Sequence, residues 1–422
     1  MKLLFFFILN FQYLYIVSTI VFPFKKNTTE YNHTYHQNIY NYFSKRIYIN
    51  ISIGTPPQII PTYLNFDQSS FYFSSEENKL YHKLDSSSYK QLQPNRSFDK
   101  EFFGFGNFSS ETLLIKNEKN KEIKLNDFQF ILASNHIYED FKPGVIGLKH
   151  APNLIVSNSS FVSQLKNKKV IDNKIYYFLY KKDDEGEFVI GKYPHEYHNK
   201  MFQKENLRLV KADEYQGFPL WSTKFDNFYF GDKLIKKEIV TFVFRTEFSF
   251  LIGSNSFFQD CSQYFFKDYL DQNKCQIDKN DTGTLFYVCD DDIDIKKFPI
   301  IKLTHKIWNY TFELTYKELF LKSKNKYFFL ICFKTYYNDL WTLGDLFLRK
   351  YTIVFDQENK VIGFYHPSNN SKISLIIFYV IFIFLLILLS MLIYIYLNYL
   401  RKGRRKIRNN EIDENYEYLI KE

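Results

Sequence analysis

The chain has 422 residues, enough for two or three domains, and 20% of them are aromatic: Phe 47, Tyr 35 and Trp 3. So much apolar surface must be buried, which excludes collagen-like, linker-like and disordered proteins. Lysine and arginine outnumber aspartate and glutamate by 55 to 46, a diffuse excess that does not indicate nucleic-acid binding.

The first segment, residues 1–24, carries one early cation, Lys2, followed by a mostly apolar run. This pattern predicts a secretory signal peptide. An uncleaved anchor is the alternative, because no clear small-residue cleavage site follows the run. In either case the chain is expected to enter the secretory route, and residues 25–46 form a polar lead segment before the folded part.

Between residues 47 and 371 the sequence has the texture of strands. YINISI, FVIG, YTIVF and KVIGFY are short apolar or alternating runs separated by polar turns. Residues 255–272 are the best helix candidate. A mostly β region of this size predicts two lobes rather than one sheet system, and we place them at 47–200 and 201–371.

The cysteines and sequons fit an exported protein. All four cysteines lie in the second half, and no Cys-x-x-Cys pair or histidine cluster accompanies them, so two disulfides are preferred to a metal site. We expect neither a metal nor a cofactor. Nine Asn-x-Ser/Thr sequons predict a glycoprotein; they begin at Asn27, Asn32, Asn50, Asn95, Asn107, Asn158, Asn280, Asn309 and Asn369.

The uncharged run 373–400 predicts one transmembrane helix, since a bilayer core needs only about 20 apolar residues. The strongly basic segment Arg401–Arg408 follows at once. By the positive-inside tendency the tail, residues 401–422, is cytoplasmic and the preceding residues are luminal or extracellular. We therefore expect a single-pass type I protein of the plasma membrane or an internal membrane. The sequence indicates no oligomeric state.

Four stretches carry a family resemblance. YINISIGTPPQ (48–58) is similar to the first strand and turn of the pepsin-like aspartic peptidases. FFGFGNFSS (102–110) is similar to the flap of these enzymes, and Phe103 stands where the family has its flap tyrosine. PGVIGL (143–148) is similar to the element that closes their first lobe. Residues 341–367 resemble the family's C-terminal strands almost position for position. The resemblance covers about residues 47–367 and implies a mostly β, bilobal fold with a cleft between the lobes.

The same resemblance implies how the cysteines pair. Cys289 and Cys332 fall where the family has its second-lobe disulfide. Cys261 and Cys275 would then form an additional bridge in a loop of that lobe.

The family's chemistry needs two aspartates, one from each lobe, that share one proton; one acts as general base on a water while the other donates to the substrate carbonyl. By the resemblance, LNFDQSSFYF (64–73) places Asp67 at the first position and FVFRTEFSFLIGS (242–254) places Arg245 at the second. An arginine stays cationic and cannot share the proton. We therefore expect an Asp67–Arg245 ion pair in place of the catalytic pair.

The residues beside these positions depart from the family pattern too. Gln68 and Ser69 replace a threonine and a glycine, Glu247 replaces the second glycine, and only Thr246 is retained. The first loop is also one residue short of the pattern, which leaves Phe73 near the family's tryptophan. The residues expected to line the retained cleft are Phe103, Gln68, Ser69, Thr246 and Glu247.

The sequence thus predicts a catalytically degenerate aspartic peptidase homologue whose cleft binds a polypeptide ligand or a protein partner. The alternative is an active membrane-anchored aspartic endopeptidase with an altered pair, in which Glu247 replaces the missing carboxylate and the substrates are secretory-route proteins. A third interpretation is a structural surface glycoprotein with no cleft ligand.

Overall fold

The computed structural model describes residues 18–27, 45–74, 81–98, 104–135, 144–150, 160–214, 219–236, 239–279, 283–334, 340–367 and 370–419. The chain is divided into two compact units, Met1–His366 and Pro367–Glu422. Phe103, the expected flap residue, lies outside the described residues, so its place over the cleft stays a prediction.

Strand β2 (Arg46–Ile53) shows how the sequence forms the sheets. Its isoleucines alternate with polar or aromatic residues, and Ile47, Ile49, Ile51 and Ile53 are all buried. Side chains of a strand point to opposite faces in turn, so this period of two places one face in the core. Gly54 then reverses the chain at φ 99°, a backbone conformation that glycine adopts without steric cost.

The first sheet of the described residues has 13 strands in the order β11-β26-β25-β9-β10-β1-β2-β3-β8-β4-β7-β6-β5. Its members from the first half of the chain are β1 (Ile20–Asn27), β2, β3 (Gln58–Asn65), β4 (Phe71–Ser74), β5 (Lys90–Phe98), β6 (Gly104–Lys116), β7 (Glu122–Asn135), β8 (Gly144–Gly147), β9 (Ile175–Lys182) and β10 (Glu185–Ile190). Its remaining members come from the predicted second lobe: β11 (Leu207–Lys211), β25 (Ile353–Asp356) and β26 (Val361–Tyr365).

Two more sheets come from the second half of the chain. The larger contains β12 (Ser222–Phe225), β15 (Val240–Phe244), β16 (Leu251–Gly253), β17 (Cys275–Lys279), β18 (Leu285–Asp290), β21 (Phe320–Ser323), β22 (Lys326–Phe329), β23 (Ile331–Phe333) and β24 (Leu340–Leu343). The smaller contains β13 (Asn227–Phe230), β14 (Lys233–Lys236), β19 (Ile301–His305) and β20 (Tyr310–Leu314). The prediction of a mostly β fold is confirmed.

The helices that the structure describes within the first unit are short. The segment predicted to be helical forms α5 (Asn255–Asp260), a π-helical turn η4 (Cys261–Phe265) and α6 (Lys267–Asp271). The others are α3 (Phe161–Asn167), α4 (Pro194–Tyr197), α7 (Tyr316–Leu319), α8 (Asp345–Lys350) and the 3-10 turns η1 (Lys83–Asp85), η3 (Lys204–Asn206) and η5 (Ile295–Lys297).

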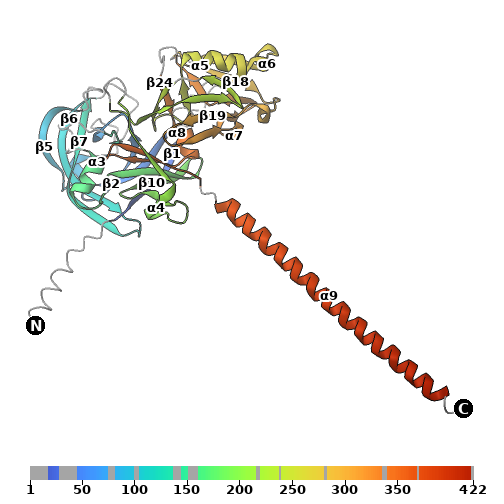
Figure 1. Ribbon diagram of the computed structural model, residues 1–422. Helices are drawn as coiled ribbons and strands as arrows, with labels where there is room; N and C mark the ends of the chain where they lie inside the picture. The colour runs from blue at the N-terminus through green and yellow to red at the C-terminus, as the bar shows by residue number, and fades with distance from the viewer. Residues whose placement is uncertain are drawn as a thin grey trace, which may run out of the picture. The chain divides into compact units, whose positions relative to one another are not determined.

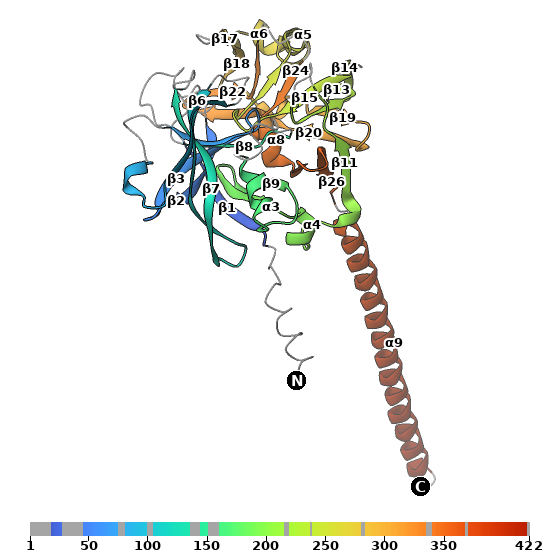
Figure 2. The same ribbon diagram turned by 90° about the vertical axis from the view of Figure 1, so that its left-hand side faces the viewer.

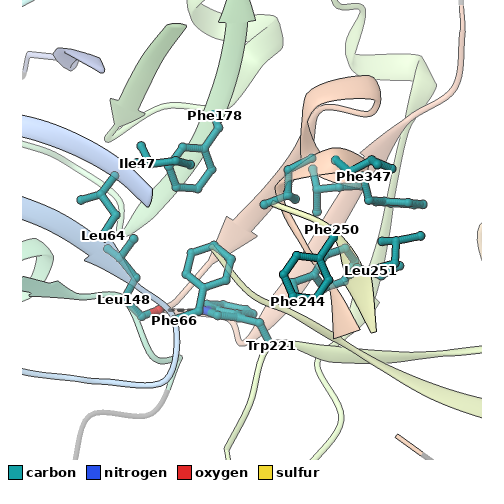
Figure 3. Close-up of a cluster of buried hydrophobic side chains, with 14 of the residues drawn as sticks. Ile47, Leu64, Phe66, Leu148, Phe178, Trp221, Phe244, Phe250, Leu251 and Phe347 are labelled. Atoms are coloured by element: carbon teal, nitrogen blue, oxygen red, sulfur yellow. Dashed lines mark hydrogen bonds between the residues drawn. The ribbon is translucent and has the colours of Figure 1, made fainter. Parts of the chain in front are cut away.

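Strands from both predicted lobes share the first sheet, because β25 of the second lobe pairs with β9 of the first. Figures 1 and 2 show strands β5 to β7 and helices α5 and α6 in separate parts of this unit. Between the lobes, an aromatic core continues without interruption: Phe66 lies 4.7 Å from Phe355, ring centre to ring centre, and Trp221 lies 5.2 Å from Phe355. Figure 3 shows part of this core.

The end of the predicted signal peptide lies in this fold. Strand β1 pairs with β10 through Ile20↔Ile190 and with β2 through Phe24↔Ile49. Its side chains at Ile20, Phe22 and Phe24 are buried in the core. A chain cut after residue 24 would lose most of β1, so a signal peptide compatible with this sheet ends earlier.

The predicted disulfide pairing is wrong. The structure joins Cys275 to Cys289, and the buried Cys261 and Cys332 are free thiols. The register of β17 and β18 explains the difference, since it sets Cys275 directly opposite Cys289. Cys332 lies instead on β23, where it pairs with Ile252 of β16.

The second unit contains one helix, α9 (Asn370–Leu419), which includes the predicted apolar run. Residues Phe378–Lys402 within it are long and apolar enough to cross a membrane, with a mean hydropathy of 3.0. The predicted apolar helix is thus present, and it continues as helix into the basic segment.

Candidate functional site

The structure brings Asp67 and Arg245 together from the two halves of the chain. Asp67 follows β3, and Arg245 follows β15. The Arg245 Nη2 atom lies 3.1 Å from Asp67 Oδ2, and the two side chains are 17% and 14% exposed. The expected ion pair is therefore present. We call the contact between residues 64–67 and residues 245–247 the loop junction.

The strand registers, however, make Asn65 and not Asp67 the counterpart of Arg245. Strand β3 runs parallel to β8, with Leu64↔Ile146 and Asn65↔Gly147. Strand β15 runs parallel to β24 in the same way, with Phe244↔Leu343 as its last pair. Asn65 comes directly after the Leu64↔Ile146 pair, and Arg245 comes directly after the Phe244↔Leu343 pair, so the two residues occupy equivalent places in the two lobes.

Two close approaches of the backbone support this register. A Cβ atom added to Gly147 would lie 2.6 Å from the carbonyl oxygen of Gln68, and one added to Gly344 would lie 2.5 Å from that of Phe248. Gln68 comes three residues after Asn65, and Phe248 comes three residues after Arg245. Both lobes therefore place a glycine against the same point of the loop.

The first position predicted from sequence is thus corrected from Asp67 to Asn65. The loop that looked one residue short has its full length when Asn65 is first, and the buried Tyr72 then takes the aromatic place that Phe73 was given. Three hydrogen bonds hold the Asn65 side chain. Its Oδ1 accepts hydrogen bonds from the backbone N–H groups of Asp67 and Gln68 at 2.7 and 3.1 Å, and its Nδ2 donates to Tyr63.

Glu247 reaches across the loop junction from the second lobe. Its Oε1 accepts a hydrogen bond of 3.1 Å from the backbone N–H of Phe66. Burial, and next the negative charge of Asp67, raise the pKa of Glu247 to about 7, and Arg245 opposes the shift. Each lobe therefore carries a carboxylate two residues after the corrected position, in Asn65-Phe66-Asp67 and Arg245-Thr246-Glu247.

The two lobes contribute different residues at equivalent places of the loop junction, Thr246 in the second lobe and Phe66 in the first. The buried Thr246 donates from Oγ1 to the carbonyl oxygen of Leu64 at 2.6 Å. Its first-lobe counterpart is Phe66, whose ring is buried in the core. Phe66 and Trp221, both labelled in Figure 3, pack against the same ring, Phe355, and Trp221 donates from Nε1 to the carbonyl oxygen of Leu148 at 2.7 Å.

Of the residues expected to line a cleft, Gln68, Ser69 and Thr246 are buried. Asp67, Arg245 and Glu247 keep partial exposure at the loop junction. Sequence reasoning missed Asn65, although the count of loop residues pointed to it. Within the ranges that the structure describes, no group of three or more His, Cys, Asp or Glu side chains is arranged to hold a metal ion.

Comparison with known proteins identifies the family. A sequence model described as eukaryotic aspartyl protease matches residues 46–366. The chain belongs to the eukaryotic aspartyl protease family. No curated protein sequence matches it.

Solved structures of the family fold resemble this chain at low identity. Basic 7S globulin from soybean has a TM-score of 0.63 and 15% identity, over 84% of this chain and 97% of the globulin. Conglutin gamma, a basic 7S globulin from lupine seeds, has a TM-score of 0.64 and 15% identity, over 84% of this chain and 96% of the other. At this identity the likeness establishes the bilobal pepsin-like fold alone.

Proposed function

We propose that this family member is catalytically inactive and that its lobes bind a polypeptide or a protein partner in the cleft. The observation that carries the proposal is the pair of residues at equivalent places in the two strand registers, Asn65 and Arg245. An amide side chain does not exchange a proton with a water nucleophile, and a guanidinium stays protonated. Neither residue supports the shared-proton chemistry that the family uses.

The surroundings support a stable but inactive junction. Arg245 pairs with Asp67, so the cation lies where a catalytic pair would need a carboxylate. Phe66 replaces the first-lobe threonine and is part of the core. Loss of one member of a cooperating catalytic group removes most of its rate enhancement, and here both members are replaced.

We further propose that the protein is a single-pass type I membrane glycoprotein. The apolar stretch Phe378–Lys402 supports an anchor, and the basic residues Arg401, Lys402 and Arg404 at its end support a cytoplasmic tail. A signal peptide that ends before Ser18 would leave β1 intact in the sheet.

The inactivity is tested with the full-length chain in detergent and an unbiased peptide library between about pH 4 and 6, the range in which such a pair works. We expect the library to remain intact while an active pepsin-like enzyme cleaves it. Photo-crosslinking of the same library should recover uncut peptides attached near the loop junction. Cleavage that disappears in Asp67→Asn would contradict the proposal, and crosslinks found only elsewhere would contradict binding in the cleft.

One observation favours a second candidate, an active endopeptidase with a relocated pair. Asp67 and Glu247 come from equivalent places in the two lobes, and the raised pKa of Glu247, caused by burial and by Asp67, keeps this carboxyl protonated in acid. Under this second proposal Asp67→Asn and Glu247→Gln would each abolish cleavage of the library. Asn65→Ala would mainly weaken the loop, because Asn65 supports it through two backbone hydrogen bonds.

A further inference from the structure

Glu247 is a carboxyl group in an environment that suits its neutral form. One oxygen, Oε1, accepts the N–H of Phe66, while Oε2 is buried and has no hydrogen-bond partner among the described residues. A buried oxygen that carries charge and receives no donor is costly. A protonated Oε2 is instead a donor without net charge.

The charged and titratable groups around Glu247 come from both lobes. Asp67 faces it from the loop after β3, Tyr63 from β3 itself, and Arg245 from its own loop. Lys334, after β23, lies within electrostatic reach of Arg245. Because Arg245 already contacts Asp67 at 3.1 Å, it compensates Glu247 only in part.

We propose that Glu247 is a proton-binding site through which the pH of the surroundings changes the distance between the two loops of the loop junction. When Glu247 is protonated, its contact with Phe66 adds to the Thr246–Leu64 hydrogen bond without repulsion. When it is ionised, it repels Asp67 and competes with that residue for Arg245, so the two loops separate. The inference goes beyond the proposed function, because it holds whatever the cleft binds.

The sign of the effect follows from the direction of the shift. Burial and the charge of Asp67 raise the pKa of Glu247 from 4.5 to about 7 in the folded protein. Between these values the folded chain binds more protons than the unfolded chain, so stability falls as pH rises. The stabilisation is complete below the unfolded value and is lost as pH rises through about 7.

The test compares the Tm of the full-length chain and of Glu247→Gln at about pH 5 and pH 8, on either side of this transition. Glutamine keeps an oxygen for the Phe66 N–H but cannot ionise. We expect the variant to melt several degrees above the natural protein at the higher pH and close to it at the lower pH. An equal loss at both pH values would show a merely structural role and overturn the proposal.

Two controls make the result specific. Burial lowers the pKa of Lys26 to about 7 as well, but Lys26 is present in both proteins and cancels in the difference. Glu318→Gln is the matched control variant. Burial alone would raise the pKa of Glu318, but hydrogen bonds from Thr315 and Lys350 lower it below its usual value. Glu318→Gln should therefore melt lower than the natural protein at both pH values, opposite to Glu247→Gln at the higher one. A pH response shared by both variants would overturn the proposal.

A direct measurement covers the case in which Glu247→Gln does not fold. The infrared carbonyl band of a protonated carboxyl group should titrate near neutral pH in the natural protein, because exposed carboxyl groups are ionised there. Where the variant folds, this band should be missing from it. No carboxyl band that titrates near neutral pH in the natural protein would overturn the proposal.

Discussion

Arg245 interacts with both carboxylates of the loop junction, as the partner of Asp67 and as the group that opposes the raised pKa of Glu247, which burial and Asp67 cause. Removing its charge would leave two acidic side chains from opposite lobes facing each other. We expect Arg245→Met, which keeps much of the aliphatic stem, to lower the free energy of unfolding by about 2 kcal/mol, since the pair is only partly exposed. Chemical denaturation at neutral pH measures this loss.

The double variant Arg245→Met/Asp67→Asn is the control for that loss. It removes the unpaired charge while it keeps a side chain of similar size, so it should recover at least half of the lost stability. The loss in the single variant should also be smaller in acid, where Glu247 is protonated. A double variant that is no more stable than the single one would show that Arg245 contributes through packing alone.

The sequence predicted only part of how the residues of the two loops are arranged. The Asp67–Arg245 contact was predicted, because a carboxylate and an arginine stand near the family positions of both lobes. Asn65 was not, since the family position is an aspartate and Asp67 matches it by residue type. Only the parallel registers of β3 with β8 and β15 with β24 fix which residues are equivalent.

At the scale of elements, the strands were the most predictable part. The runs YINISI, FVIG, YTIVF and KVIGFY correspond to β2, β10, β25 and β26, because alternation and turn residues are local signals. The disulfide partner depends on the register of β17 and β18, which no local pattern determines. Strand β1 was not predicted, because it lies in an apolar run whose pattern is equally typical of a signal peptide.

Strand β1 gives a prediction about processing. It lies between β10 and β2 in the sheet and buries Ile20, Phe22 and Phe24. Exposing the sheet edges and the core that these side chains cover would cost several kcal/mol, since each large apolar side chain contributes about 2 kcal/mol when buried. The N-terminus of the mature protein, read by mass spectrometry, should therefore lie at or before Ser18.

Phe24→Asp tests the same strand without processing. A charge in the place of this buried ring should prevent accumulation of folded protein, whereas Lys25→Asp, at the neighbouring exposed side chain, should not. A mature chain that begins after Asn27 and folds normally would show that β1 is dispensable.

At the scale of the whole molecule, the two units differ in where their apolar side chains lie. The lobed body buries them, whereas the C-terminal helix exposes them. Residues Phe378–Lys402 are predominantly apolar and their side chains are exposed, which a soluble protein rarely tolerates in water. A bilayer removes that cost, because a helix satisfies its own backbone groups and presents only side chains to lipid. We therefore expect the full-length chain to stay with membranes after alkaline carbonate washing, and a chain ending at Pro367 to be recovered in the medium.

Orientation is the sharper part of this prediction. If the basic end of α9 is cytoplasmic, protease added to intact microsomes should remove an epitope placed after Glu422 and leave the body, residues 18–367, protected. Asn309 provides a second readout, since it is exposed in the β19–β20 turn and should carry a glycan only when the body is luminal. Asn309→Gln is the matched control and should remove one glycan without changing membrane attachment. Protection of the epitope together with an unmodified Asn309 would reverse the proposed orientation.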